Sequence, residues 1–146
     1  MSKQDEAGLI LKLYELRREE TMRKARDWFA QEFHPTSFED SMQTMMSDKS
    51  AYMRMVGSYW EMAAALVNQG AISQEMFDAA NGEHIGVFAK IEPILAEMRS
   101  TFNMPEMFQQ LEKLIDNTPD GRQKVAKVRE MMKAMLAQRQ AKAQQA

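Results

Sequence analysis

Apolar residues recur at intervals of three and four along most of the chain, and this spacing predicts amphipathic α-helices. The two longest helices are expected over residues 49–69 and 83–102. Apolar positions spread around much of the first helix, which is typical of a helix surrounded by others. Gly70 follows it and predicts a left-handed helix stop. We therefore expect 49–69 and 83–102 to form a central antiparallel pair.

Shorter helices are expected before, between and after this pair. The apolar stripe in residues 5–33 changes phase within the charged residues 17–21, which fits one bent helix and two separate helices equally well. Pro93 lies inside the helix expected over 83–102 and predicts a kink there. Four polar residues stand where they can cap the first turns of expected helices: Ser37, Asp48, Ser73 and Asn103.

The expected fold class is all-α, an irregular bundle of five to seven helices. No alternating run of apolar and polar residues bounded by turns predicts a β-strand. Residues 1–137 are expected to form a single helical domain, since a chain of 146 residues suits one domain. Residues 138–146 have no apolar face, and we expect this polar tail to fray or project.

Composition narrows the possible chemistry. The chain contains no cysteine, which excludes disulfides, thiolate metal sites and cysteine nucleophiles. Its net charge of −2 gives no overall attraction to nucleic acid. The first residues carry acids where a secretion signal needs basic and then apolar residues, and no apolar run is long enough for a membrane span. A soluble cytoplasmic protein is therefore expected.

Five polar residues interrupt the apolar pattern of the expected central pair. Glu61 lies among residues that should be packed. Asn81, Glu83 and His84 surround a break between helices, and Lys90 follows one helical stretch later. One hypothesis is that these side chains converge on a polar pocket. The alternative, which we favour, is that Glu61 forms an ion pair that aligns two helices and that His84 is a structural, packed histidine.

Known catalytic and metal-binding motifs are absent from the sequence. The di-iron bundle motif requires a glutamate three residues before each histidine. Asn81 occupies that position before His84, and Gln31 occupies it before His34. HExxH, phosphate-loop and dinucleotide patterns are also missing. We assign no catalytic residue, no cofactor and no metal ligand.

Methionine is unusually frequent, with 15 residues in the chain. Six of them cluster in one third of it: Met42, Met45, Met46, Met53, Met55 and Met62. Because methionine is an adaptable apolar filler, we favour a role in the core. The alternatives are an adaptable groove for a peptide or lipid, and a copper(I) site.

The C-terminal segment 119–146 is basic. It holds seven basic and two acidic residues, a net charge of +5, which leaves −7 for the remainder of a chain whose total is −2. We favour a solvated helix that packs back on the acidic body. Binding to anionic lipid or nucleic acid is a weaker alternative, since the segment has no aromatic residue for stacking.

A pattern of short motifs carries a family resemblance. It begins with residues 13–29 and continues with the Trp60–Glu61 pair, the segment Asn-Gln-Gly-Ala-Ile (68–72) and the acidic–aromatic turn 75–77. A later helix with Lys90, Ile91, Pro93 and Arg99 completes it. Over about residues 9–115 the chain resembles a family of uncharacterised bacterial proteins, known as a domain of unknown function. The resemblance implies a helical bundle and carries no activity and no catalytic residues.

Three functions are compatible with these observations. The first is a non-enzymatic protein-interaction module that self-associates, favoured by the missing catalytic motifs, the methionine-rich helices and the charge-segregated tail. The second is a small-ligand-binding protein or enzyme with a pocket at the central helix pair, using Glu61, His84 and Lys90. The third is binding of anionic lipid or nucleic acid through the basic C-terminal helix. A homo-oligomer and an unidentified protein partner are the expected associations.

Overall fold

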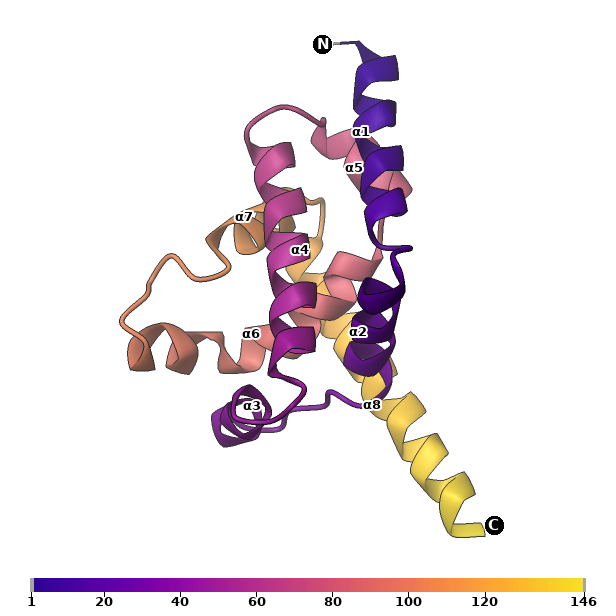
Figure 1. Ribbon diagram of the computed structural model, residues 1–146, viewed down its shortest axis with the longest axis vertical. Helices are drawn as coiled ribbons and strands as arrows, with labels where there is room; N and C mark the ends of the chain where they lie inside the picture. The colour runs from indigo at the N-terminus through magenta and orange to yellow at the C-terminus, as the bar shows by residue number, and fades with distance from the viewer. Residues whose placement is uncertain (1, 146) are drawn as a thin grey trace.

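A computed structural model describes residues 2–145 and folds them into eight α-helices without a β-strand (Figure 1). The helices are α1 (Lys3–Leu16), α2 (Glu20–Gln31), α3 (Phe38–Met45), α4 (Ser50–Asn68), α5 (Gln74–Ala80), α6 (Glu83–Thr101), α7 (Gln109–Asn117) and α8 (Gly121–Gln145). The expected all-α class is confirmed. The expected number of five to seven helices was too low, partly because the first apolar stretch divides into two helices.

The charged residues 17–19 separate α1 from α2. Glu19 caps α2, since its carboxylate accepts hydrogen bonds from the backbone N–H of Thr21 and of Met22. Arg26 donates a side-chain hydrogen bond to the carbonyl of Arg17, which ends α1. The phase change seen in the sequence is therefore a true helix break rather than a bend.

Two of the four expected N-caps are present, on α3 and α5. The hydroxyls of Ser37 and Ser73 accept hydrogen bonds from the backbone N–H groups three residues later. Asp48 was expected to cap the long helix, and this was wrong: Lys49 occupies the cap position of α4 and provides no side-chain bond. Gly70 ends α4 with a φ of 87°, as expected.

Asn103 does not start a helix. It has a φ of 52°, and its side chain is compatible with this left-handed conformation, so it turns the chain after α6. The following helix, α7, begins only at Gln109, after Phe108 has also adopted a left-handed conformation. The expected start at Asn103 was therefore wrong, and residues 102–108 form a connecting segment rich in apolar side chains.

Helix α4 lies between α2 and α7, and it packs most extensively against these two helices. Helix α6 packs mainly against α8 and contacts α4 much less extensively. Figure 1 shows α6 running across α4 rather than alongside it. The central antiparallel pair expected from the sequence is thus not the main packing unit of the fold.

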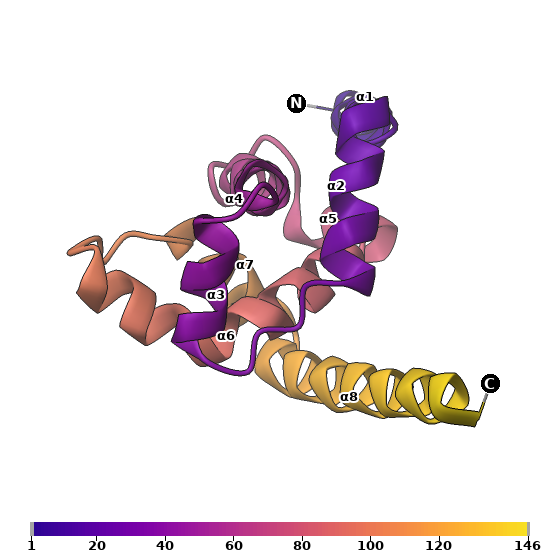
Figure 2. The ribbon, with the colours of Figure 1, turned by 60° about the horizontal axis from the view of Figure 1, so that its bottom comes forward.

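The core lies where α4, α5, α6 and α7 meet. Its largest fully buried apolar side chains are Trp60, Phe77, Phe88, Ile72, Leu111, Leu114 and Ile115. Helix α8 is buried only at its first turns, and its C-terminal half extends from the body (Figure 2). The helix continues to Gln145, so the fraying expected for residues 138–146 stays a prediction.

No helix within residues 2–145 has both the length and the apolar character required to cross a membrane.

Candidate functional site

Glu61 lies on α4 and binds the start of α7. Its two carboxylate oxygens accept hydrogen bonds from the backbone N–H of Gln110, at 3.0 Å, and of Leu111, at 2.8 Å. Helix α7 has no side-chain cap of its own. A carboxylate also complements the partial positive charge at a helix N-terminus. Glu61 is therefore an N-cap that one helix provides for another.

Other residues of α4 near Glu61 also contact α7 and the residue that precedes it. A Cβ atom on Gly57 would lie 2.9 Å from Cζ of Phe108, so any larger residue would push this ring from its present position. Asn68 donates from Nδ2 to the carbonyl and side-chain oxygens of Gln110, both at 2.9 Å. The small and polar positions that stood out on this helix thus serve its contact with α7.

Lys90 projects from α6 to the end of α2. Its ammonium group donates hydrogen bonds to the carbonyls of Phe29, at 2.6 Å, and Ala30, at 3.2 Å. These carbonyls lack helical partners, and a cation complements the C-terminal end of a helix. Burial lowers the pKa of Lys90 to about 8. The residue caps a neighbouring helix, as Glu61 does.

Glu83 and Asn81 are also engaged locally. Glu83, in the first turn of α6, receives two hydrogen bonds from Arg26, at 2.7 and 2.9 Å, and lies 3.7 Å from Nη1 of Arg17. Asn81 donates from Nδ2 to the carbonyl of Phe77, at 3.4 Å. Both side chains therefore hold the α5–α6 break against α1, α2 and α5.

His84 is a core residue with no exposed surface. Its ring packs edge-on against Phe77, with centroids 5.0 Å apart, and at a tilt against Trp60, at 5.9 Å. Neither ring nitrogen has a hydrogen-bond partner among the described residues. Burial lowers the pKa of His84 to about 4, so the ring is neutral at neutral pH.

The structure does not bring the five predicted residues together. Glu61 lines one pocket, whereas Glu83 and Lys90 line a second, smaller one of about 260 Å³. Asn81 and His84 line neither of these two pockets. A polar site that combines Glu61, His84 and Lys90 is therefore not what this fold presents.

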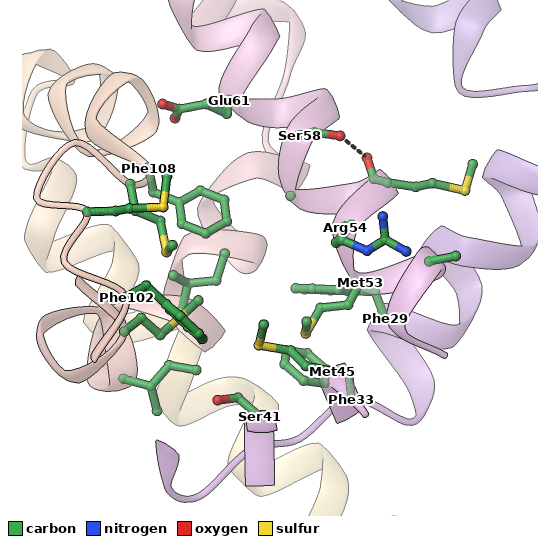
Figure 3. Close-up of a pocket in the computed structure, with 18 residues that line it drawn as sticks. Phe29, Phe33, Ser41, Met45, Met53, Arg54, Ser58, Glu61, Phe102 and Phe108 are labelled. Carbon is green, nitrogen blue, oxygen red and sulfur yellow. Dashed lines mark hydrogen bonds between the residues drawn. The ribbon is translucent and has the colours of Figure 1, made fainter. Parts of the chain in front are cut away.

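A cavity of about 760 Å³ lies between the C-terminal end of α2, α3, α4, α6 and the segment 102–108. Figure 3 shows Phe102 and Phe108 on one side of it, and Met53 and Arg54 on the other. Its wall is dominated by methionine and phenylalanine: Met45, Met53, Met55, Met98, Met104, Met107, Phe29, Phe33, Phe102 and Phe108. We call this cavity the methionine pocket.

Few polar side chains line the methionine pocket, and most are already bonded. The Glu61 carboxylate caps α7. The hydroxyls of Ser41 and Ser58 donate to backbone carbonyls one turn earlier on their own helices. Arg54 is the one cation on the wall and forms no ion pair within residues 2–145. Its single side-chain hydrogen bond, to Ser50 Oγ, is long at 3.4 Å.

The methionine cluster was expected to fill the core, and this holds only in part, since Met53 and Met55 are partly buried and pack against the core. None of its six members is among the buried residues. Met45, Met53 and Met55 line the pocket, while Met46 is 84% exposed. The other apolar residues of the pocket come from the C-terminal end of α2, from α6 and from the segment 102–108.

The basic helix α8 is tied to an acidic surface. Arg122 binds Glu92, Glu112 and Asp116 with N–O distances of 2.5, 3.0 and 2.7 Å, and Arg129 binds Glu92 at 2.6 Å. These contacts join α8 to α6 and α7. They agree with the preferred hypothesis that this helix packs back on the acidic body.

Most of the chain matches a known protein family. Residues 5–118 match the family described as a domain of unknown function (DUF4760), and the chain belongs to this family. The resemblance seen in the sequence is confirmed, and α8 lies outside the matched region. Comparisons with curated proteins and with solved structures give no match. Within residues 2–145, no three His, Asp or Glu side chains gather as metal ligands would.

Proposed function

We propose that this member of the DUF4760 family is a non-enzymatic binding protein, and that its ligand is a small, largely apolar molecule held in the methionine pocket. The observation that carries the proposal is the pocket itself. Its volume of about 760 Å³ lies within the range of roughly 300–1,000 Å³ typical of ligand sites. Methionine side chains adapt their shape to a ligand more readily than branched ones do.

The polar groups near the pocket support binding rather than chemistry. Glu61 is committed to α7, and the hydroxyls of the two wall serines donate to backbone carbonyls rather than to a base. His84, the histidine of the enzyme hypothesis, is sealed among aromatic rings outside the pocket. A reaction would need an activated nucleophile or a positioned acid and base. The polar side chains near the pocket instead form hydrogen bonds or packing contacts that stabilise the fold.

Binding can be tested with the neutral fluorophore N-phenyl-1-naphthylamine, whose emission rises in apolar surroundings. The full-length protein should bind it saturably. Ala51→Phe and Ser58→Phe place rings at exposed positions on the pocket wall, so each should weaken binding at least about tenfold, equivalent to ~1.4 kcal/mol. Ala126→Phe, exposed on α8, is the matched control. No saturable binding, or equal binding by all variants, would overturn the proposal, provided circular dichroism shows each variant folded.

Self-association is a second candidate, favoured by the surface of α8. The accessible area of the chain is 8987 Å², whereas a monomer of this mass is expected to expose about 7,700 Å². Met131 and Met135 lie one turn apart on the projecting helix and are 55% and 57% exposed. A second copy covering this stripe would remove part of the excess area.

Light scattering coupled to size exclusion tests the self-association candidate. The native protein should elute as a dimer, and Met131→Glu combined with Met135→Glu should give a monomer. Ala134→Glu, on the same stretch of α8 but outside the stripe, should leave the dimer intact. A native monomer at all concentrations rejects this candidate. The lipid and nucleic-acid alternative is less favoured, because Arg122 and Arg129 are already bound to carboxylates.

A further inference from the structure

We infer that the ligand of the methionine pocket is a single-chain amphipathic carboxylate, with its apolar chain against the methionines and phenylalanines and its head group on Arg54. The inference rests on the proposed function, because it names the class of molecule that the pocket takes. It is carried by two independent features of the same cavity: a long apolar wall, and one cation without a carboxylate partner.

The charge balance at the cavity leads to this ligand class. Arg54 is the only basic residue on the wall, and every arginine with an ion pair lies elsewhere in the described structure. Glu61 shares the pocket-facing side of α4, but both of its oxygens are occupied by α7. Arg54 therefore has no carboxylate partner, and its only side-chain hydrogen bond, from Nε to Ser50, leaves both terminal amino groups able to pair a carboxylate through two parallel hydrogen bonds.

The position of Arg54 separates the head of the ligand from its tail. Arg54 is exposed, so its guanidinium lies at the solvent side of the pocket, whereas buried side chains such as Ile91, Ile94 and Met98 line the inner wall. Ser58 stands one helical turn from Arg54, but its hydroxyl already donates to the carbonyl of Met55, which leaves the guanidinium as the group that binds the head (Figure 3). A charged head at the entrance and an apolar chain inside match this division.

The inner wall disfavours polar ligands. A sugar or a nucleobase carries several donors and acceptors, and each would lose its water on entering without gaining a partner from methionine or phenylalanine. A simple hydrocarbon would contact the apolar wall but would offer no anion to Arg54. A carboxylic acid with one long chain can contact the apolar wall and pair with Arg54 at the same time.

Matched amphiphiles test the inference on the full-length protein. Dodecanoate, dodecanol, dodecylammonium and dodecyl phosphate share one chain and differ only in the head group, and each can compete with N-phenyl-1-naphthylamine for the pocket. Dodecanoate should bind about tenfold more tightly than dodecanol, because only its carboxylate can pair with the accessible guanidinium. This ratio of affinities corresponds to ~1.4 kcal/mol. Dodecylammonium should bind most weakly.

Arginine variants locate the head group. Arg54→Gln should remove the preference for dodecanoate, because it should lower the affinity for dodecanoate far more than the affinity for dodecanol. Arg54→Lys should keep part of the preference, since it retains the charge but not the paired donors. Arg23→Gln, an exposed arginine on α2 away from the pocket, should behave like the native protein.

The outcomes separate the inference from the proposed function. Equal affinity for dodecanoate and dodecanol, or a preference that survives Arg54→Gln, overturns the inference and leaves apolar binding standing. Stronger binding of dodecyl phosphate than of dodecanoate overturns the carboxylate assignment. Failure of all four compounds and of the fluorophore to bind overturns the proposed function as well.

Discussion

Glu61 illustrates how much one side chain contributes when it caps a helix other than its own. Two backbone N–H groups of α7 depend on its carboxylate. Glu61→Ala should reduce the free energy of unfolding by about 2–3 kcal/mol, because both donors lose an ionic acceptor. Glu61→Gln keeps one acceptor oxygen and should cost about half as much.

Urea unfolding followed by circular dichroism measures both Glu61 variants. Glu97→Ala is the control, since Glu97 is exposed on α6 and its side chain forms no hydrogen bond or ion pair within residues 2–145. Its effect should stay within about 0.5 kcal/mol of zero. If Glu61→Ala were as mild as this control, the capping role assigned to Glu61 would be rejected.

His84 makes stability depend on pH. Its pKa falls from an ordinary 6.5 to about 4 on folding, because burial disfavours the charged ring. Between pH 6.5 and 4, His84 is therefore protonated in the unfolded chain but neutral in the folded chain. The free energy of unfolding consequently decreases as the pH drops towards 4. The loss from this residue should reach about 2 kcal/mol at pH 5.

The His84 contribution is isolated by replacing the ring. His84→Leu should flatten the dependence of unfolding free energy on pH between 6.5 and 5. His34→Gln should change it less, because His34 is partly exposed and bonded to the carbonyl of Gln31, although burial lowers its pKa as well. An unchanged slope in His84→Leu would assign the pH dependence to other groups.

At the scale of helices, local signals explain which ends were predictable. Ser37, Ser73 and Gly70 act within their own turn, so a few neighbouring residues suffice to recognise them. Asn103 failed because asparagine suits both a cap and a left-handed turn, and the chain around it decides between them. Glu61 could not be assigned from sequence, since its partners lie about fifty residues further along the chain.

The junction between α7 and α8 depends on a glycine whose role the local sequence did not reveal. A Cβ atom on Gly121 would lie 1.9 Å from the carbonyl oxygen of Ile115, so any other residue would force the two helices apart. Asp120, just before it, has a φ of 55°. This tight turn places α8 against α6, where its arginines meet Glu92.

Docking of α8 should depend on Glu92 and on salt. Glu92 binds both Arg122 and Arg129, so Glu92→Ala leaves two guanidinium groups without this partner. We expect a loss of about 1–2 kcal/mol in unfolding free energy at low salt, and a smaller loss at high salt because these groups are partly exposed. Urea titrations at the two salt levels measure it.

The control for the docking prediction is a solvent-exposed pair on α8 itself. Glu130→Ala removes an ion pair with Lys133 whose members are 74% and 67% exposed, and its effect should be close to zero. A loss in Glu92→Ala that is the same at low and high salt would indicate packing rather than charge as the source of docking.

For the molecule as a whole, the all-α class was predictable and the methionine pocket was not. Helical spacing is a local property of the sequence, and it extends over most of the chain. The methionine pocket draws its wall from α2, α3, α4, α6 and the segment 102–108, so it exists only once these parts are assembled. The excess of methionine was a signal of it, but from the sequence that signal favoured a filled core over a groove.

Because the pocket joins distant parts of the chain, its ligand should stabilise the entire fold. Dodecanoate that binds only the folded state raises the free energy of unfolding by about 2.7 kcal/mol at a hundredfold excess over its Kd. Hydrogen exchange should show the largest added protection in α3 and residues 102–108, which border the cavity and carry partly exposed side chains. Arg54→Gln should reduce the shift in melting temperature, and Arg23→Gln should not. Protection confined to α8, which contributes nothing to this wall, would place the ligand elsewhere.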